Sequence, residues 1–435
     1  MKTVKVGLCG LGTVGAGTFK LLAANETEIA DRAGCQVTVA HVGARRDKPE
    51  CPTGSVPVSR DLMDVAADPD IDILVELIGG TDTALELVRA AIANGKHVVT
   101  ANKALIAEHG NELFATAAKA GVSIGYEAAV AGGIPIIKAL REGLAANRIQ
   151  WLAGIINGTG NFILSEMRDK GREFADVLAE AQALGYAEAD PTFDVEGIDA
   201  AHKLVILAAI AFGMPLEFDK VYTEGISDIA TVDVDYAEEL GYRIKHLGIA
   251  RRTDKGIELR VHPTLIPEKR LLANVNGVKN AVLVEGDAVG PTLYYGAGAG
   301  AEPTASAVVA DIVDLSRSLA LEQAPAVAEL GVRSEAIVRQ PILAIEDVET
   351  AWYLRMTAED KPGVLSDVAS ICSRAGVSIE ALIQKEPAEG ETRVPVIILT
   401  NRTREGELIR VASEIEALDT IAGHITRIRV ESLDG

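Results

Sequence analysis

The first residues of the chain constrain its fold more than any other segment. A run of apolar and β-branched residues, VKVGLC (4–9), leads at once into the glycine turn GLGTVG (10–15) and the helix-forming segment AGTFKLLAA (16–24). In this context the glycines permit a tight turn, close approach of a pyrophosphate, and close helix packing, with the pyrophosphate at the positive helix end. An ordinary glycine turn is the alternative. We expect a dinucleotide-binding domain whose cofactor contacts include Gly10, Gly12, Thr13, Val14 and Gly15.

The end of the second predicted strand indicates which cofactor this domain binds. After QVTVAHVG (36–43), where NAD-dependent enzymes usually carry an acid for the ribose 2′-hydroxyl, this chain has Arg45 and Arg46. An arginine there suits the 2′-phosphate of NADP, so we expect Arg45 to bind NADP, with NAD as the alternative cofactor. Two solvated surface arginines are the other interpretation of the same residues.

The alternation of elements predicts an α/β protein with several domains. Residues 1–135 alternate short β-branched runs with Ala-rich helical segments, which is typical of a Rossmann-like doubly wound parallel sheet. Residues 136–300 mix longer helices with strands and favour an α+β domain for the substrate. A proline- and charge-punctuated stretch at 332–350 is a predicted linker, and the βαββαβ order over 351–435 fits a small ferredoxin-like module.

Composition excludes several classes of partner and location. Sixty-three Asp and Glu against 42 Lys and Arg give a net charge of −21, which disfavours nucleic acid and anionic membranes as partners. The cysteines lack a C-x-x-C spacing and are expected to be reduced, mostly buried thiols: Cys9, Cys35, Cys51 and Cys372. A strand so close to the first residue leaves no room for a signal peptide, and the apolar run 204–216 is too short to span a membrane. We expect a cytoplasmic protein.

The stretch LGYAEADPTFDVEGIDAAHK (184–203) concentrates acidic residues and ends in one lysine. It leads into LVILAAIAF (204–212), so a helix across this junction carries Asp199 and Lys203 into a core as i,i+4 neighbours. Partial burial favours the neutral form of a lysine, which can then exchange protons near neutrality. The acids need a cationic ligand, and a substrate ammonium group would serve. A surface salt bridge and a calcium site interrupted by Pro191 are the alternatives.

Six segments together resemble the homoserine dehydrogenases of the single-function type with a C-terminal ACT module. They are GLGTVG (10–15), TANKAL (100–105), EAAVAGGIPI (127–136), GIINGTGNFIL (154–164), LGYAEADPTFDVEGIDAAHK (184–203) and GAGAGAEPTA (296–305). The resemblance covers essentially the whole chain. It implies a reversible hydride transfer between NAD(P)H and L-aspartate 4-semialdehyde that gives L-homoserine, in threonine, methionine and isoleucine biosynthesis. It also implies a Rossmann domain completed by about residues 300–325 and a second domain that takes part in dimerisation.

The same resemblance assigns roles to residues of the acidic stretch and of TANKAL. Lys203 would donate the proton to the forming alkoxide, and Lys103 would lie beside cofactor and substrate. Glu188 and Asp199 would hold the substrate, with Asp194 as a supporting acid. These residue types suit the chemistry, because lysines stabilise negative charge that grows on the aldehyde oxygen as hydride adds to the carbon. Carboxylates can hold the α-ammonium group by charge-assisted hydrogen bonds.

Cofactor and metal contacts are implied in the same way. The further cofactor residues would be Thr100, Lys103, Gly185 and Gly300, although GAGAG (296–300) by itself fits a flexible turn. Backbone carbonyls would hold a monovalent cation, Na⁺ or K⁺, at Glu127, Val130, Gly132 and Ile134. The chain departs from the family in NGTGN (157–161), where Gly160 replaces the usual Thr or Ser, and this bears on cofactor preference and turnover.

The C-terminal segment AEDKPGVLSDVASICSRAGVSIEAL (358–382) resembles an ACT domain. Asp360, Pro362 and Gly363 form its strand-to-helix loop, and the helix start offers free amide donors to an amino-acid carboxylate. ACT modules typically pair between subunits, so we expect a homodimer or homotetramer and feedback control by L-threonine. A purely structural dimerisation domain is the alternative.

Two other functions compete with this interpretation. An amino-acid-responsive regulatory protein with a degenerate Rossmann domain would be expected to lack Lys103, Lys203 or the glycine turn, and all three are present. Another Rossmann-type reductase would act on an aldehyde or imine of a different amino acid. Glu188 and Asp199 favour substrates with a free ammonium group but do not select among them.

Overall fold

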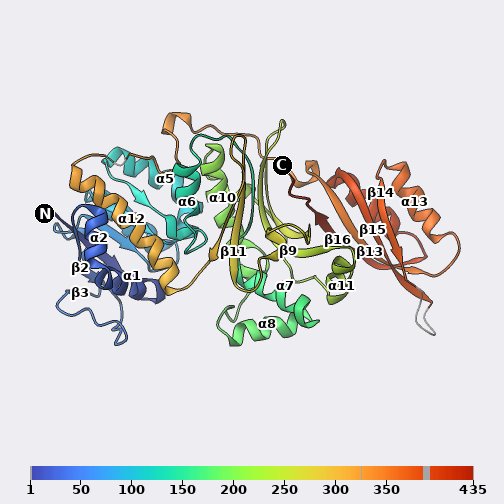
Figure 1. Cartoon of the computed structure of the whole chain (residues 1–435), viewed down its shortest axis with the longest axis horizontal. Helices are drawn as coiled ribbons and strands as arrows, with labels where there is room; N and C mark the ends of the chain where they lie inside the picture. Colours follow the sequence, from blue (N-terminus) through green and yellow to red (C-terminus); the bar gives the residue numbers. More distant parts are fainter. Residues whose placement is uncertain (1, 325, 386–391, 435) are drawn as a thin grey trace. The chain divides into compact units, whose positions relative to one another are not determined.

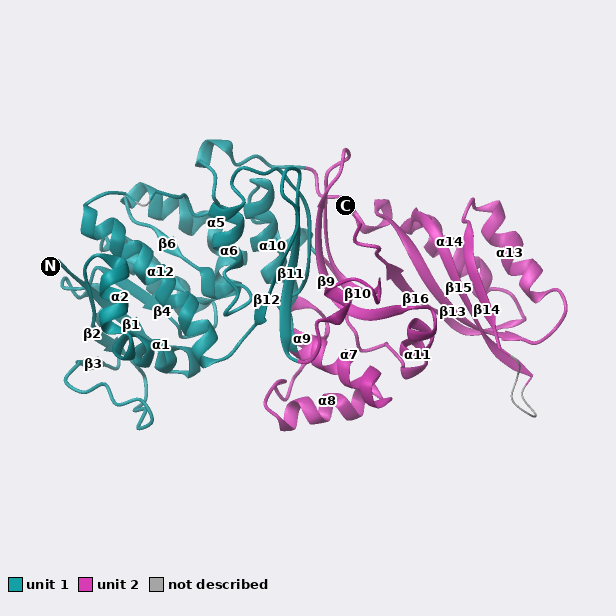
Figure 2. Ribbon diagram, viewed as in Figure 1, with its two compact units in different colours: residues 1–158, 199–221, 278–340 teal, residues 159–198, 222–277, 341–435 magenta. Residues whose placement is uncertain are grey.

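The computed structural model describes residues 2–324, 326–385 and 392–434 (Figure 1). Residues 1 and 325, which belong to the predicted Rossmann domain and its completion, and residues 386–391 and 435 of the predicted C-terminal module lie outside the described residues. The chain forms two compact units (Figure 2). The first unit contains residues 1–158, 199–221 and 278–340, and the second contains 159–198, 222–277 and 341–435.

A parallel sheet forms the centre of the first unit. Its strand order is β3-β2-β1-β4-β5-β6, and every pair is parallel, which confirms the predicted doubly wound sheet. The order reverses between β1 and β4, where such sheets bind their ligands. The strands are β1 (Thr3–Cys9), β2 (Gln36–Gly43), β3 (Val58–Ser59), β4 (Ile73–Glu76), β5 (His97–Thr100) and β6 (Ile124–Gly125).

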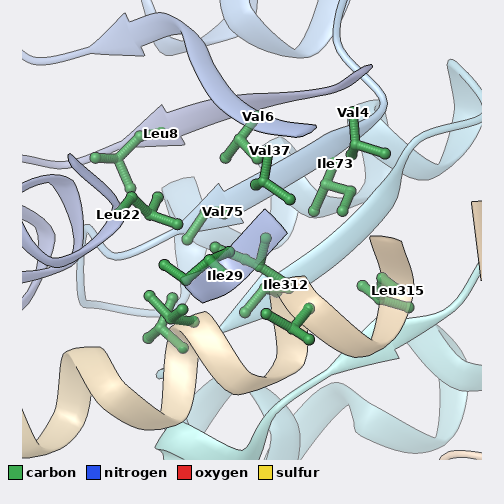
Figure 3. Close-up of a cluster of buried hydrophobic side chains, with 14 of the residues drawn as sticks. Val4, Val6, Leu8, Leu22, Ile29, Val37, Ile73, Val75, Ile312 and Leu315 are labelled. Carbon is green, nitrogen blue, oxygen red and sulfur yellow. The ribbon is translucent and has the colours of Figure 1, made fainter. Parts of the chain in front are cut away.

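Helices cover this sheet and bury its apolar side chains. The first unit as a whole contains the helices α1 (Thr13–Ala24), α2 (Glu26–Ala33), α3 (Leu62–Ala67), α4 (Asp82–Ala93), α5 (Lys103–Ala120), α6 (Ile136–Lys138), α10 (Ile198–Phe212) and α12 (Ala301–Leu321). Figure 3 shows one face, where alternate residues of β1 and β4 point toward α12 and pack with Leu22, Ile29, Ile312 and Leu315. Burial of these side chains holds α12, which is distant in sequence, against the parallel sheet. The unit also contains an antiparallel β12-β11-β7 arrangement of β7 (Ile149–Ile155), β11 (Lys279–Gly286) and β12 (Gly290–Ala297).

The second unit joins an α+β part to the C-terminal module. Its first elements are α7 (Gly158–Lys170), α8 (Phe174–Ala183), α9 (Thr192–Val195), β8 (Tyr222–Thr223), α11 (Thr231–Glu239), β9 (Tyr242–Arg252) and β10 (Ile257–Pro267). The module follows as β13 (Glu349–Glu359), α13 (Val364–Arg374), β14 (Ile379–Gln384), β15 (Arg393–Arg404), α14 (Glu405–Glu416) and β16 (Ile421–Val430), which confirms the predicted βαββαβ order. Short 3-10 turns lie at Glu127–Ala129, Phe218–Lys220, Leu272–Asn274, Ser334–Ala336 and Ile345–Asp347, and a π turn lies at Ala139–Gly143.

The last strand of the module, β16, also pairs with a strand from the other part of the second unit. β16 pairs antiparallel with β13 on one side and parallel with β10 on the other. Across this junction lies a buried arginine–carboxylate network of Arg251, Glu258, Arg260 and Glu431. The Arg260 guanidinium donates to Glu431 Oε1 at 2.5 Å and to Glu258 Oε2 at 2.9 Å, and Arg251 donates to Glu431 Oε2 at 2.9 Å. Charge-assisted bonds therefore bind the module to β10.

The structure also confirms the expectations for the cysteines. Cys9, Cys35, Cys51 and Cys372 are all buried, and none of them forms a disulfide within the described part of the chain. Among the described residues, no helix is long and apolar enough to cross a membrane.

Candidate active site

A cavity of about 330 Å³ opens at the carboxyl end of the parallel sheet, over the glycine turn. Its wall is built from the turn itself, from the segment after β2, and from the segment after β4. The residues that line it include Gly10, Leu11, Gly12, Arg45, Arg46, Leu77 and Ile78. The cavity therefore lies at the point of strand-order reversal, where the fold binds a nucleotide.

The backbone of the glycine turn explains why this cavity exists. Gly10 has φ +102°, and a Cβ there would lie 2.5 Å from the carbonyl oxygen of Leu77. A Cβ on Gly15 would lie 1.9 Å from the carbonyl oxygen of Gly10, so the turn and α1 pack in contact. A Cβ on Gly12 would meet nothing within 4 Å, which leaves open room directly before Thr13 at the start of α1. These residues fit a pyrophosphate, because unpaired amide groups at a helix start bind anions.

Arg45 and Arg46 lie on the wall of the same cavity. Both are exposed, and no carboxylate of the described residues forms an ion pair with either guanidinium. Lys48 lines the same cavity, and the other side chains that line it are apolar. A phosphate group on the adenosine side of a dinucleotide would complement these positive charges.

A lysine–carboxylate cluster lies in the same unit. It consists of Lys103, Asn157, Asp199 and Lys203. The Asp199 carboxylate accepts from Lys203 Nζ at 2.6 Å and from Asn157 Nδ2 at 2.9 Å through Oδ2, and Lys103 Nζ lies 3.1 Å from Oδ1. The side chains of Asp199 and Lys203 are 6% and 12% exposed, whereas that of Lys103 is 32% exposed. The cluster confirms the predicted i,i+4 pair and the partial burial of Lys203.

The electrostatics of this cluster keep Asp199 ionised. Burial by itself would raise the pKa of the Asp199 carboxyl, but the charges of Lys203 and Lys103 outweigh that effect. Hydrogen bonds from Lys203 and Asn157 add to them, and the pKa falls to about 2. A buried carboxylate with this pKa is a fixed negative charge at neutral pH, and it holds two ammonium groups at one place.

Local structure sets the position of each lysine. Lys103 is the first residue of α5, whose N-cap is Asn102: its Oδ1 accepts from Leu105 N at 3.1 Å. Lys203 lies one turn into α10, and its Nζ also donates to the carbonyl oxygen of Ile156 at 2.7 Å. Two of its three ammonium protons are used in this way, and the third has no partner among the described residues.

The remaining residues of the acidic stretch belong to the second unit. Gly185, with φ +74°, follows the C-cap residue Leu184 of α8, and the exposed Glu188 lies in the loop between α8 and α9. Gln182 Nε2 donates to the carbonyl oxygen of Glu188 at 3.1 Å and so fixes that loop from within. Asp194 lies in the short helix α9, where its backbone N–H donates to Pro191 O at 2.9 Å.

The segment from Glu127 to Ile134 has the backbone of a tight, buried loop. Ala131 and Gly132 both have positive φ, +55° and +50°, and Gly133 N donates to Ala297 O at 2.9 Å. The Glu127 carboxylate is used elsewhere, since it accepts from the backbone N–H groups of Ile137 and Lys138 at the start of α6. Backbone carbonyl oxygens are hard ligands that suit a monovalent cation. The described residues contain no cluster of three His, Cys, Asp or Glu side chains that would hold a different metal.

The other two predicted sites are also part of ordered loops. Gly300, with φ +122°, is the N-cap residue of α12, close to where Gly17 of α1 packs on the carbonyl of Ala301. In the C-terminal module, Gly363 has φ +100° and precedes α13 directly. The Asp360 carboxylate accepts from Gln384 Nε2 at 3.0 Å, so that loop is held against β14.

Sequence reasoning missed two partners in the lysine–carboxylate cluster. Asn157 was part of the NGTGN segment, but its hydrogen bond to Asp199 joins residues that lie 42 positions apart. The Ile156 carbonyl that accepts from Lys203 leaves no trace in residue type. The unusual density of Gly and Asn in 157–161 was the only local signal.

A parallel sheet with a glycine-turn cavity, and two lysines on one buried carboxylate in the same unit, are features expected of a nicotinamide-dependent oxidoreductase, and comparison with known proteins gives the family. Models for a homoserine dehydrogenase NAD-binding domain, a homoserine dehydrogenase and an ACT domain match residues 10–127, 135–313 and 352–418. The homoserine dehydrogenases of Pseudomonas aeruginosa and Neisseria gonorrhoeae are 64% and 55% identical over the whole of both chains. The crystal structure of a homoserine dehydrogenase from Thiobacillus denitrificans is 61% identical, with a TM-score of 0.95 over 100% of this chain and 99% of that one. The chain belongs to the homoserine dehydrogenase family of oxidoreductases, with a C-terminal ACT domain.

Proposed function

We propose that the protein catalyses the reversible, NADP-dependent reduction of L-aspartate 4-semialdehyde to L-homoserine. The observation that carries this proposal is the pair of lysines, Lys103 and Lys203, held on Asp199 in the unit that contains the glycine-turn cavity. A reduced nicotinamide, when bound, supplies the hydride. The residues of this chain then have to bind the substrate, stabilise the oxygen that becomes negative, and deliver a proton to it.

Lys203 is the proposed proton donor. Lys203 Nζ uses two of its three N–H groups for Asp199 and the Ile156 carbonyl, so the third can donate to a substrate oxygen. Lys103, the more exposed lysine, adds positive charge beside cofactor and substrate. In the reverse direction Lys203 accepts the hydroxyl proton of homoserine.

The carboxylates are proposed to hold the substrate. Asp199 fixes the lysines, and with Glu188 it would bind the α-ammonium group by charge-assisted hydrogen bonds, with Asp194 as a supporting acid. The exposed position of Glu188 suits a residue that meets its ligand from solvent. A substrate without an ammonium group would not make this contact with the exposed Glu188 carboxylate, which disfavours it.

The proposed cofactor site includes the glycine turn, Thr100, Gly185 and Gly300, with Arg45 on the 2′-phosphate. Support for NADP comes from the two cavity-facing arginines and from a 26% identical hyperthermophilic archaeal homoserine dehydrogenase, whose structure is a complex with NADPH. Arg45→Gln should weaken NADP binding about tenfold, the order of one charge-assisted contact, and leave NAD binding unchanged. Equal weakening of both would contradict the role given to Arg45.

A monovalent cation, Na⁺ or K⁺, is proposed on the carbonyls of Glu127, Val130, Gly132 and Ile134. It would stabilise a loop with two consecutive left-handed residues, so its role would be structural. The division into a substrate domain at 136–300, a linker at 332–350 and a regulatory module at 351–435 belongs to the same proposal.

Regulation is proposed to reside in the ACT domain. L-Threonine would bind at the loop of Asp360, Pro362 and Gly363, and the ACT domains would pair in a homodimer or homotetramer. These proposals rest on the ACT match and on the free helix start behind Gly363. Cytoplasmic threonine, methionine and isoleucine biosynthesis is the proposed setting.

The decisive experiment measures nicotinamide reduction by the purified full chain with L-homoserine, first with NADP⁺ and then with NAD⁺, in the presence of Na⁺ or K⁺. We expect turnover with NADP⁺ to exceed that with NAD⁺. A titration with L-threonine in the same assay tests the effector, and sedimentation tests the oligomer. A protein that binds either cofactor but oxidises no homoserine would contradict the proposed substrate.

A further inference from the structure

Glu76 is a buried acid that none of the roles above uses. It is the last residue of β4, and its exposed fraction is 0%. Its carboxylate accepts from Thr100 Oγ1 at 2.6 Å and from Ile78 N at 2.8 Å. No Lys, Arg or His of the described part of the chain forms an ion pair with it. Glu76 is thus a carboxylate in the protein interior whose partners are neutral donors.

The hydrogen bond from Thr100 links Glu76 to the start of α5, the helix that carries Lys103. The Thr100 hydroxyl, which donates to Glu76, accepts from Asn102 N at 3.0 Å. Asn102 caps α5 through Leu105 N and also donates from Nδ2 to Gly80 O at 2.6 Å. The start of α5 is therefore tied to the end of β4 through the Glu76 carboxylate.

The hydrogen bond from Ile78 N links Glu76 to the wall of the cofactor cavity. Glu76 Oε1 holds Ile78 N, and both Leu77 and Ile78 line the cavity over the glycine turn. Leu77 also donates to Cys9 O at 2.8 Å, and its carbonyl oxygen is the atom that Gly10 approaches. The Glu76 carboxylate thus fixes the segment after β4, next to the turn that would receive the pyrophosphate.

The position of Glu76 in the sheet gives its charge a further consequence. In a doubly wound sheet the two nucleotides of a dinucleotide lie on the two sides of the reversal point, at the carboxyl ends of the strands. β4 and β5 end on the side of β1 opposite β2 and the cavity-facing Arg45, so the nicotinamide half of a bound dinucleotide would lie on the same side of the sheet as Glu76. The oxidised nicotinamide is a cation and the reduced one is neutral. A buried negative charge acts strongly through a protein interior and stabilises the cation.

Neutral donors make such a charge possible. Burial raises the pKa of Glu76, and the hydrogen bonds from Thr100 and Ile78 offset only part of that rise, so the binding test below is made at alkaline pH, where the carboxylate form is favoured. An ion pair with lysine or arginine would cancel the field of the carboxylate, whereas hydroxyl and amide donors solvate it and leave its net charge in place.

We propose that Glu76 is a positioning residue for the cofactor, and that its buried carboxylate makes the site prefer the oxidised nicotinamide. The carboxylate holds the segment after β4 and the start of α5, and its charge separates the affinities for NADP⁺ and NADPH. This inference rests on the proposed function, because it requires that the cavity binds the nicotinamide cofactor.

The test compares dissociation constants for NADP⁺ and NADPH in Glu76→Gln. The amide can still accept from Ile78 N and donate to Thr100 Oγ1, so shape is kept and charge is lost. We expect the affinity for NADP⁺ to fall about tenfold relative to that for NADPH, the order expected for one unit charge in a protein interior. NADPH binding is read from nicotinamide fluorescence, and NADP⁺ binding from competition.

Control variants separate this role from a structural one. Glu76→Asp retains the charge and should restore the preference for NADP⁺. Glu86→Gln, which removes an exposed charge from α4, should leave both constants unchanged. If Glu76→Gln does not fold, Glu76→Ser, which leaves room for water, must show the same loss of preference.

The outcomes distinguish the two proposals. If Glu76→Gln weakens NADP⁺ and NADPH equally, the charge has no effect on the cofactor and the inference is overturned. If the unsubstituted protein binds neither cofactor, the proposed function itself fails. A shift in the ratio that Glu76→Asp reverses supports both.

Discussion

Two clusters of buried charge, one in each compact unit, hold a carboxylate with different cations. In the first unit Lys103 and Lys203 hold Asp199, and in the second unit Arg260 holds Glu431 together with a second arginine. Burial by itself would raise the pKa of both carboxyl groups, yet in each case the paired cations lower it to about 2. The two carboxylates therefore share one protonation state at neutral pH, and the clusters differ only in what holds them.

The cations give the two clusters different chemistry. Arg260 is 0% exposed and its guanidinium donates to two carboxylates and faces His262 Nε2, so its donors are committed. An arginine also cannot give up its proton in a protein, whereas a lysine can. Lys203 keeps one donor without a partner among the described residues, and Lys103 is partly exposed. The lysine–carboxylate cluster is suited to proton transfer, and the arginine–carboxylate network is suited to holding β10 and β16 together.

The largest expected effect concerns Lys203. Lys203→Ala should lower kcat by about 10²–10⁴-fold, the range for loss of a general acid, while NADP(H) binding stays nearly intact. Lys203→Arg sharpens the comparison, because it keeps the positive charge next to Asp199 but cannot exchange its proton near neutrality. We expect Lys203→Arg to remain as slow as the alanine variant. Steady-state kinetics and direct cofactor binding measure both.

Lys220→Ala is the matched control, since this lysine is 57% exposed and pairs only loosely with Asp219 at 3.7 Å. It should have ordinary turnover. If Lys203→Arg restored turnover, charge alone would explain the role of Lys203. A loss of cofactor affinity with turnover retained would contradict its assignment as the proton donor.

The second expected effect is on stability and lies in the other cluster. Glu431→Gln removes one of the two carboxylates that the buried Arg260 and Arg251 share, and leaves them only Glu258, so the free energy of unfolding should fall by about 3 kcal/mol. The folded fraction should keep its kcat, because Glu431 lies in none of the proposed binding sites. Chemical denaturation measures the first quantity, and activity per folded molecule measures the second.

Glu414→Gln provides the comparison within the same module. Glu414 pairs with Arg374, and their side chains are 50% and 63% exposed, so its loss should change stability little. An equally large effect of both substitutions would show that burial is not what gives the arginine–carboxylate network its strength.

The two clusters also differ in how far the sequence predicts them. Asp199 and Lys203 are four residues apart on one helix, so their ion pair follows from helical spacing alone. Arg260 and Glu431 lie 171 positions apart, and their contact depends on the parallel pairing of β10 with β16. No local pattern specifies that pairing, since any strand end with an acid could have met β10.

The same reasoning explains what was found of the fold and what was missed. The glycine turn predicts the first sheet because only glycine fits at these positions: a side chain at Gly10 or Gly15 would collide with backbone atoms. Glu76 has no such signal, because an acid at the end of an apolar strand is normally predicted to lie at the surface. Only the structure shows that it is buried and bonded to Thr100 and Ile78. Local chemistry was predictable, and contacts between distant segments were not.

The smallest expected effect is a slope of stability against pH, and it tests whether the two carboxylates are equivalent. The pKa is about 2 for both, below the ordinary 3.8 of Asp199 and 4.5 of Glu431. Because the folded pKa is the lower one, the unfolded chain takes up protons first as pH falls. The stability from each pair is complete above its ordinary pKa and is lost as pH falls toward about 2.

Each group contributes at most about 1.4 kcal/mol per pH unit within its window. In Asp199→Asn and in Glu431→Gln, the free energy of unfolding should decrease less between about pH 5 and about pH 3 than it does in the unsubstituted protein. The difference should begin at a higher pH for Glu431→Gln, because the ordinary pKa of glutamate is the higher one. Denaturant titrations of the three proteins across this range measure the slopes. If only Glu431→Gln changed the slope, Asp199 would titrate in the folded protein as it does in the unfolded chain. The lysines would then be held by geometry rather than by a fixed charge, and the parallel between the two clusters would fail.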